Sequence, residues 1–217
     1  MISGFNKIAV LIWDFDGTFY KPLPKLWHDV RIAEFRVIMA HTGWDQNKAE
    51  IEFEKLYKHR FDSATQTSAF LSNISIAEAA VEMERFFDRR NYLKKDPRLV
   101  RLFEKLRHFR HFTLANGVIA RHIETFKILG LAPQIFEEMV TSETVGFTKP
   151  NPQGFQYILD KTKLPPSSHL MIGDREIVDL VPAKKLGMKT CLVWSDKKSV
   201  IADITLKTVY ELSSLFT

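Results

Sequence analysis

Residues 8–18 read IAVLIWDFDGT, an unbroken apolar run from Ile8 to Trp13 that passes directly into Asp14 and Asp16. A continuous apolar run of this length is typical of a strand that is covered on both faces, as in a parallel sheet. Because side chains alternate along an extended chain, the two carboxylates lie on the same side of the strand end, and the glycine after them permits a sharp turn. The stretch therefore predicts a buried strand with paired carboxylates at its tip.

Strands and helices alternate over the second half of the chain. We expect further strands at His111–Ala115, Glu138–Thr141, His169–Ile172 and Thr190–Val193, a weaker one near Ile204, and helices at 118–129, 153–162 and 177–185. Strands separated by helices of this length imply right-handed crossovers and an α/β fold with a doubly wound parallel sheet. In such sheets a ligand lies beyond the carboxyl ends of the strands.

A helical insertion separates the first strand from the rest. From Leu23 to Lys95 the apolar spacing is helical, with expected helices near 30–38, 51–57, 69–74 and 77–87. Asp96 and Pro97 then form a good helix start, an N-cap followed by proline at the first helical position. We therefore expect an α/β core at residues 1–20 and 96–217 and an all-helical domain at 21–95.

Composition places the chain among globular proteins. Of its 217 residues, 45% are apolar and 26% charged, which is enough to build a core in one large domain or one domain with an insertion. The longest apolar run is too short for a membrane span or a secretory leader, so we expect a cytoplasmic protein without a membrane partner. The single cysteine, Cys191, excludes an internal disulfide framework and is expected to be an inert core thiol.

The net charge of +5 is concentrated in one stretch. Residues Arg85 to Arg110 contain ten Lys and Arg against three Asp and Glu. Such a stretch could attract nucleic acid or another anion. Apolar residues recur within it at helical spacing, however, which favours the exposed faces of two helices. We expect no specific nucleic-acid binding.

Polar residues follow several of the expected strands. Paired carboxylates such as Asp14 and Asp16 can bind Mg²⁺, with one carboxylate as nucleophile and the other, its pKa raised by its neighbour, as general acid and base. Asp174 and Asp179 follow a later strand and are well placed to complete a cation site. The plain alternative for Asp14 and Asp16 is a turn with hydrated acids.

Two further segments reach the same edge of the predicted sheet. The backbone N–H groups of Asn116 and Gly117, in the sequence Leu-Ala-Asn-Gly, precede a helix and could hold a phosphoryl oxygen. Lys149, in the segment from Gly146 to Pro150, could neutralise a phosphoryl dianion. Taken alone, an Asn-Gly dipeptide is an ordinary loop and a lysine is usually an exposed charge.

In order and spacing, four segments together resemble the haloacid dehalogenase-like hydrolase superfamily. They are Asp14–Thr18 (DFDGT), Leu114–Gly117 (LANG), Lys149–Pro152 (KPNP) and Gly173–Asp179 (GDREIVD), and they span nearly the whole chain. The resemblance implies a Rossmann-like core. The helical insertion directly after the first segment is similar to that family's helical cap, of the C1 type.

The resemblance also implies a mechanism. Asp14 would attack phosphorus to form an aspartyl-phosphate, while Asp16 protonates the leaving oxygen and then activates the hydrolytic water. Lys149 would stabilise negative charge, and Thr18 would help to orient Asp16. Members that break carbon–halogen or carbon–phosphorus bonds lack an acid at the position of Asp16, so phosphate-ester chemistry is favoured.

The same resemblance supplies a metal and its ligands. Mg²⁺ would be held by Asp14, by the backbone carbonyl of Asp16 and by Asp174, with Asp179 supporting it directly or through water. Asn116, Gly117, Lys149 and Thr18 would surround the phosphoryl group. The expected substrate is a small phosphorylated metabolite.

One position departs from the family pattern. Where the family has Ser or Thr before the asparagine of the second segment, this chain has Ala115. The missing hydroxyl is one donor to a charged group, worth about 1.5 to 3 kcal/mol, so we expect activity to be weakened but not abolished. Thr113 should lie about 6.6 Å deeper and is a poor substitute.

The sequence thus predicts a Mg²⁺-dependent phosphatase for a small phosphomonoester. A phosphomutase, which returns the phosphoryl group to a sugar phosphate, is the nearest enzymatic alternative. A catalytically weakened binding or regulatory protein is the other alternative, supported by Ala115. Tyr20 and Lys21, which follow the first segment, are modest candidates for substrate contacts, and no motif in residues 21–95 identifies a leaving group.

Overall fold

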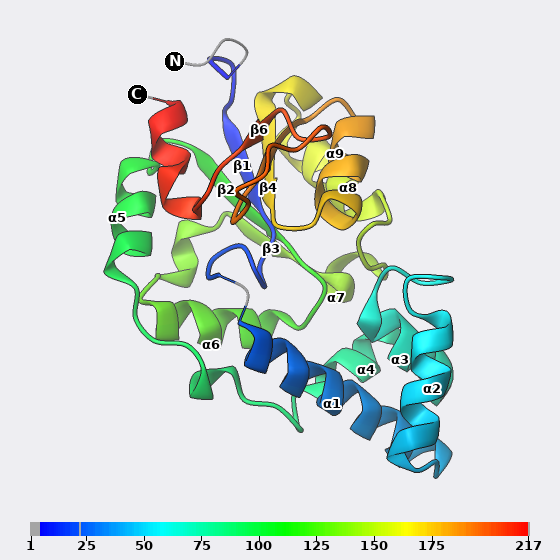
Figure 1. The fold of residues 1–217 in the computed structure, drawn as a ribbon. Coiled ribbons are helices and arrows are strands. Elements are labelled where there is room, and N and C mark those ends of the chain that lie inside the picture. The colour runs from blue at the N-terminus through cyan, green and yellow to red at the C-terminus, as the bar shows by residue number, and fades with distance from the viewer. Residues whose placement is uncertain (1–4, 22, 217) are drawn as a thin grey trace.

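A parallel sheet of six strands forms the centre of the computed structural model, which describes residues 5–21 and 23–216 (Figure 1). The strands are β1 (Val10–Trp13), β2 (Arg110–Leu114), β3 (Glu138–Val140), β4 (His169–Gly173), β5 (Lys189–Leu192) and β6 (Ile204–Thr205). Their order is β3-β2-β1-β4-β5-β6, and every neighbouring pair is parallel. The chain builds outward from β1 on one side and then returns to its other side, which makes the end of β1 the switch point where ligands bind in such sheets.

The alternation of side chains along β1 divides the core into two layers. Leu11 and Trp13 face one side of the sheet, where they pack with α5 (Pro97–Lys105), α6 (Ile119–Leu129) and the 3-10 helix Val209–Leu215. Val10 and Ile12 face the other side, where they pack with α8 (Gln153–Thr162) and α9 (Val181–Lys185). All four strand residues are buried, so this strand is apolar throughout and not alternating.

The helical insertion forms a bundle beyond the end of β1 (Figure 1). Its helices are α1 (Pro24–Thr42), α2 (Gln46–Leu56), α3 (Ala64–Ser72) and α4 (Ile76–Met83), followed by a 3-10 turn, Arg89–Asn91. A small core of Phe35, Ile38, Ala49 and Phe53 joins α1 to α2. The side chains of Asp45, Ser63 and Ser75 cap the second, third and fourth helices at their N-termini.

Most expected elements occur within a few residues of their predicted bounds. Asp96 caps α5 by accepting a hydrogen bond from the Arg98 backbone N–H at 2.9 Å. The helix expected at 177–185 is divided into a single π-helical turn, Glu176–Leu180, and the short α9. Pro182 has no N–H to donate, so regular helical bonding is interrupted at this point.

Other differences have equally local causes. The helix expected to reach residue 87 ends at Met83, after which the chain turns and carries Phe87 into the main core. A short helix, α7 (Ser142–Val145), and the C-terminal 3-10 helix were not predicted. In the latter, Val209, Leu212 and Leu215 are buried at intervals of three, the 3-10 period, which a search for 3.6-residue spacing misses.

Two expectations from composition can be compared with the structure directly. None of the helices in the described part of the chain combines the length and apolar character that a membrane span requires. Cys191 is a free, fully buried thiol in β5, and burial raises its pKa well above the ordinary range. A thiol in this environment is inert, as the sequence predicts.

Candidate active site

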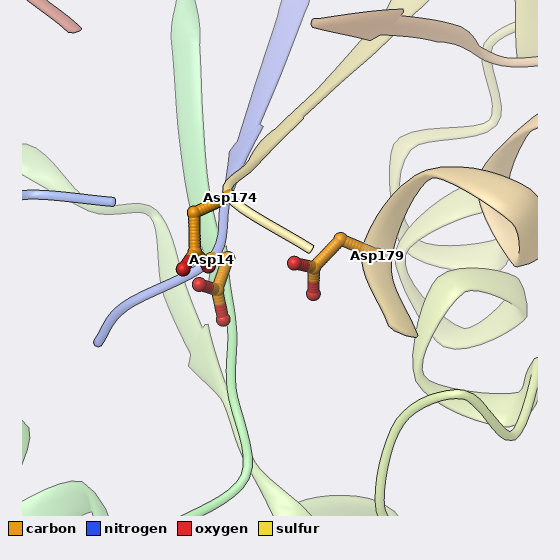
Figure 2. A group of neighbouring side chains, drawn as sticks. All are labelled: Asp14, Asp174 and Asp179. Atoms are coloured by element: carbon orange, nitrogen blue, oxygen red, sulfur yellow. The ribbon is translucent and has the colours of Figure 1, made fainter. Parts of the chain in front are cut away.

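Three carboxylates converge at the carboxyl ends of β1 and β4 (Figure 2). Asp14 follows β1, Asp174 follows β4, and Asp179 lies in the π-helical turn beyond it. Each offers an oxygen that lies within 4.8 Å of the others. The parallel register pairs Trp13 with Ile172, so Asp14 and Asp174 follow the ends of two adjacent strands.

Lys149 joins two of these carboxylates. Its Nζ donates to Asp14 Oδ1 at 2.5 Å and to Asp179 Oδ1 at 2.6 Å, and its side chain is buried. Asn116, which follows β2, clamps the lysine's backbone: its Oδ1 accepts from Lys149 N at 2.7 Å, and its Nδ2 donates to Lys149 O at 3.1 Å. The asparagine side chain therefore fixes the loop that delivers the lysine, a contact that the sequence does not predict.

The turn after β1 brings Thr18 back to the strand end. Thr18 Oγ1 donates to Asp14 Oδ2 at 2.9 Å. The prediction that Thr18 orients Asp16 was therefore wrong, because the turn brings the hydroxyl back to Asp14. The reversal depends on Gly17, which has a φ of +87°. A Cβ at this glycine would lie 2.5 Å from Asp174 Oδ2. Both the backbone conformation and the close approach of the carboxylate therefore require glycine here.

The electrostatics of the three carboxylates fit a divalent cation. Burial, followed by the charges of Asp14 and Asp179, raises the pKa of Asp174 to about 8. The buried Asp174 Oδ1 accepts no hydrogen bond from any described residue. Burial lowers the pKa of Lys149, but the charges of Asp14 and Asp179 outweigh it and leave that pKa raised. Mg²⁺ binds hard oxygen donors such as these carboxylates. The unpaired Asp174 Oδ1 is free to coordinate the cation, whose charge would offset the repulsion among the three carboxylates.

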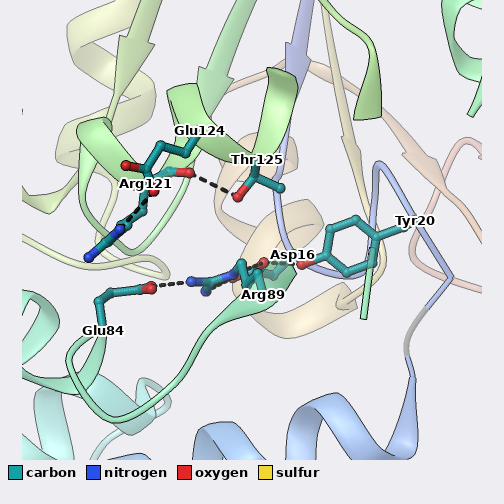
Figure 3. A network of polar contacts seen from close by, with 7 residues as sticks. All are labelled: Asp16, Tyr20, Glu84, Arg89, Arg121, Glu124 and Thr125. Carbon is teal, nitrogen blue, oxygen red and sulfur yellow. Dashed lines mark hydrogen bonds and ion pairs between the residues drawn. The ribbon is translucent and has the colours of Figure 1, made fainter. Parts of the chain in front are cut away.

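Asp16 lies apart from this cluster and faces the helical insertion (Figure 3). Arg89 donates to it twice, from Nε to Oδ1 at 3.2 Å and from Nη2 to Oδ2 at 2.8 Å. The hydroxyl of Tyr20 also donates to Oδ1, and Arg89 Nη1 donates to Glu84. Tyr20 is therefore a buried partner of Asp16, whereas Lys21 is exposed.

These contacts reverse the pKa shift that the sequence predicts for Asp16. Burial raises its pKa, but the charge and hydrogen bonds of Arg89, with the hydrogen bond from Tyr20, outweigh burial and leave the pKa below its ordinary value. The expectation of a raised pKa was wrong because Arg89 contacts Asp16 in the folded protein. Arg89 is 73 residues away in the chain, so this contact could not be predicted from the sequence around Asp16. The one signal in the sequence was the position of Arg89 within the basic stretch 85–110.

A cavity of about 320 Å³ lies over Asp14, Asp16 and Asp174, and its volume is near the lower end of the size range of small-molecule sites. The predicted phosphate-binding residues Thr18 and Lys149 do not line it and reach it only through their contacts with Asp14. The residues of the cavity wall that follow strands are Asp14, Asp16, Ala115, Asn116, Asp174 and Arg175. The rest of the wall comes from the helical insertion and consists of Trp27, Val30, Arg31, Glu34, Tyr57, Lys58, Ser63, Ala64, Thr65, Met83 and Arg89. Gly117 does not line this cavity. Instead, a Cβ at that position would lie 2.9 Å from His122 Nε2. The close packing of His122 against the backbone therefore accounts for a glycine at this position.

A model of the haloacid dehalogenase-like hydrolase family matches residues 11–193. The chain belongs to this family. A glyceraldehyde 3-phosphate phosphatase of Methanopyrus kandleri is 26% identical over 196 residues, which are 84% of this chain and 82% of that protein. A protein of the same name from Methanocaldococcus jannaschii is 31% identical over 104 residues, 46% of this chain and 45% of that protein. In this second match the chain spans less than half the length of its relative.

Solved structures of this haloacid dehalogenase-like family share the fold. A phosphatase from Thermococcus onnurineus superposes with a TM-score of 0.69 at 21% identity, over 96% of this chain and 98% of that one. The magnesium-bound HAD-hydrolase YfnB of Bacillus subtilis has a TM-score of 0.65 at 18% identity, over 97% and 99% of the two chains. The predicted Rossmann-like sheet is thereby confirmed.

Proposed function

We propose that this chain is a Mg²⁺-dependent phosphatase that hydrolyses a small phosphomonoester through an aspartyl-phosphate on Asp14. The arrangement of Asp14 carries the proposal: it lies at the base of a small cavity, with Lys149 on one oxygen and Thr18 on the other. Relatives named glyceraldehyde 3-phosphate phosphatase support the same chemistry and make that compound the first substrate to test.

In the first half-reaction Asp14 attacks phosphorus while the bond from phosphorus to the leaving oxygen breaks. Lys149 offsets the negative charge that the nucleophile and the phosphoryl group bring together. Mg²⁺, held by Asp14, the Asp16 carbonyl and Asp174 with support from Asp179, would supply the remaining positive charge. Thr18 and Lys149 hold the Asp14 carboxylate in one orientation, which lowers the entropic cost of attack.

Asp16 is the proposed proton carrier. With Arg89 bound, its pKa is below the ordinary value, so Asp16 is a carboxylate with no proton to give. Once an Arg89 contact is released, Asp16 takes up a proton from solvent, gives it to the leaving oxygen, and later takes one from the water that attacks phosphorus, which releases inorganic phosphate and regenerates Asp14. Both Asp16 oxygens are occupied by Arg89 in the described arrangement, so one of these contacts must be exchanged for the leaving oxygen. Movement of the helical insertion relative to the sheet would accomplish that exchange.

Ala115 is the observation that favours the binding-protein alternative. It lines the cavity beside Asn116, and the family pattern has a residue with a hydroxyl at this position. The contact of Lys149 with Asp14, and the position of Asp174 beside Asp14, nevertheless support hydrolysis. We therefore retain hydrolysis as the proposed activity and treat the alternative as an outcome of the experiment.

The test is phosphate release from glyceraldehyde 3-phosphate, glycerol 3-phosphate and an aryl phosphate, with Mg²⁺ and with excess chelator. Asp14→Asn is the control for contaminating activity. Hydrolysis in ¹⁸O-water places solvent oxygen in the released phosphate, whereas a phosphomutase releases none. A folded protein that releases no phosphate from the panel with Mg²⁺ would overturn the proposal and favour a binding role.

A further inference from the structure

One face of α1 forms the roof of the cavity. Trp27, Val30, Arg31 and Glu34 all line it, and their spacing of three, four and seven residues places them on one side of a helix. The carboxyl ends of the strands form the opposite wall. A phosphoryl group at Asp14 would therefore direct its leaving group toward this face of α1.

Glu34 is the unusual member of that face. Its side chain is only 3% exposed, and Oε2 is buried without accepting a hydrogen bond from any described residue. Burial raises its pKa to about 7, although the charge of Arg31 opposes the shift. Native proteins contain few such groups, because leaving a buried acceptor unsatisfied is costly.

Arg31 only partly satisfies this carboxylate. Its Nε forms an ion pair with Glu34 Oε2 at 3.1 Å, but the pair does not have the geometry of a hydrogen bond. Instead, Arg31 Nη1 donates to Glu54 Oε1 at 2.7 Å, and the guanidinium lies over the rings of Phe53 and Tyr57 at 4.3 and 4.4 Å. Contacts outside the cavity thus also hold the arginine, and Glu34, which lines the cavity, retains an oxygen that accepts no hydrogen bond from the described residues.

We propose that Glu34 is a specificity residue, which accepts a hydrogen bond from a hydroxyl of the leaving group and so selects phosphomonoesters of small polyhydroxy compounds. The proposal rests on the phosphatase activity proposed above. An apolar leaving group would leave the carboxylate unsatisfied, and sites built around a substrate hydroxyl discriminate strongly against analogues that lack it.

The experiment compares glycerol 3-phosphate with n-propyl phosphate, which has the same three carbons and no hydroxyl. We expect the parent to prefer glycerol 3-phosphate at least tenfold in kcat/KM. Glu34→Met should lower kcat/KM for glycerol 3-phosphate about ten- to a hundredfold, the factor corresponding to one hydrogen bond to a charged group, and leave n-propyl phosphate within threefold. Glu34→Gln, which keeps an acceptor, should lie between.

Glu50→Met is the matched control, since Glu50 is an exposed glutamate of α2 and does not line the cavity. It should leave the preference unchanged. Equal losses on both substrates in Glu34→Met, or no preference in the parent, would overturn the proposal.

Failure of the phosphatase activity itself gives a different result, namely a folded parent that hydrolyses neither ester. Calorimetric binding of the two esters then decides the role of Glu34. Glycerol 3-phosphate should bind at least tenfold more tightly than n-propyl phosphate to the parent but not to Glu34→Met. Equal affinities for the parent would remove the role assigned to Glu34.

Discussion

Both oxygens of Asp14 have a partner that holds them in place. Lys149 lies 135 residues away in the chain and Thr18 only four, yet both contact the same buried carboxylate. A nucleophile fixed by two partners loses little orientational freedom when substrate binds. This is the residue whose removal should affect the chemistry most.

Asp14→Asn should lower turnover at least a thousandfold, because an amide is a poor nucleophile and a poor ligand for Mg²⁺. The fold should persist, since the residue lies at a strand end and Lys149 keeps its contact with Asp179. Phosphate release measured by a coupled assay, with circular dichroism as the control for folding, tests this. Activity within tenfold of the parent would contradict the assignment of the nucleophile.

Ala115 gives a second prediction at this scale. Ala115→Ser should raise kcat/KM on phosphomonoesters, because a hydroxyl that strengthens its hydrogen bond in the transition state contributes about 1.5 to 3 kcal/mol, or roughly ten- to a hundredfold in rate. The position is buried and lines the cavity. Ala115→Thr adds more bulk, and strain of about 1 to 3 kcal/mol could cancel its gain.

Rate measurements on the parent, Ala115→Ser and Ala115→Thr separate the gain from the added hydroxyl from the loss caused by packing strain. A gain in the serine variant alone indicates packing strain in the threonine variant. If both variants fold and bind Mg²⁺ but neither gains on any accepted substrate, Ala115 does not face the phosphoryl group.

Individual residues also show where sequence reasoning succeeds. Asp14, Lys149 and Asp174 could be located because each follows a predicted strand, and parallel strands deliver their ends to one edge. The partner of Asp16 could not be located in this way. Arg89 lies in a turn whose path depends on how the whole helical insertion packs, and no local pattern encodes that.

Among the elements, the turn after β1 is the most constrained. Gly17→Ala should destabilise the protein by about 1 to 3 kcal/mol through its left-handed backbone and should also weaken Mg²⁺ binding, because the new Cβ displaces Asp174. Thermal unfolding with and without Mg²⁺ measures both effects. The Mg²⁺-dependent rise in Tm should shrink in this variant.

Gly43→Ala is the matched control. Gly43 ends α1 with a φ of +70°, but an added Cβ there meets nothing within 4 Å. The control should therefore lose stability while keeping the full Mg²⁺ shift. Equal Mg²⁺ shifts in both alanine variants would show that Gly17 does not support the cation site.

Helix periodicity predicts that α1 exists, but it does not predict which side of the helix lines the cavity. The buried residues Phe35, Val37 and Ile38 follow apolar spacing and could be predicted as core. Glu34 lies among them in the sequence and has no pattern of its own. Only the tertiary arrangement, which turns this side of the helix toward the strand ends, distinguishes it from an exposed glutamate.

Across the whole molecule, the basic stretch 85–110 is divided among several structural contacts. Arg89 points inward to Asp16, Arg98 contacts Asp96, and Arg110 donates twice to Glu137. Leu99, Leu102 and Phe103 within the same stretch are buried in the core. The interpretation as the faces of two helices was wrong in one respect, because the stretch contains one α-helix, α5, and a 3-10 turn. The contacts of these arginines argue against a continuous basic surface, and the lack of specific nucleic-acid binding stays a prediction.

The stability of the whole molecule should also report on Glu34. Below about pH 4.5 this carboxyl is protonated in both the folded and unfolded states. Between the ordinary value of 4.5 and the folded value of about 7, the unfolded chain releases the proton while the folded chain retains it. Ionisation therefore favours the unfolded state, and stability falls as pH rises through this window, by about 3 kcal/mol at most.

The comparison with Glu34→Gln isolates this contribution, because every other titrating group, Asp174 included, is present in both proteins. The free energy of unfolding of the parent, minus that of the variant, should decrease from pH 4.5 to 7 and level off above it. Denaturant titrations at pH 5, 6, 7 and 8 measure this difference. A constant difference across the series would mean that the pKa of Glu34 is not raised in the folded protein.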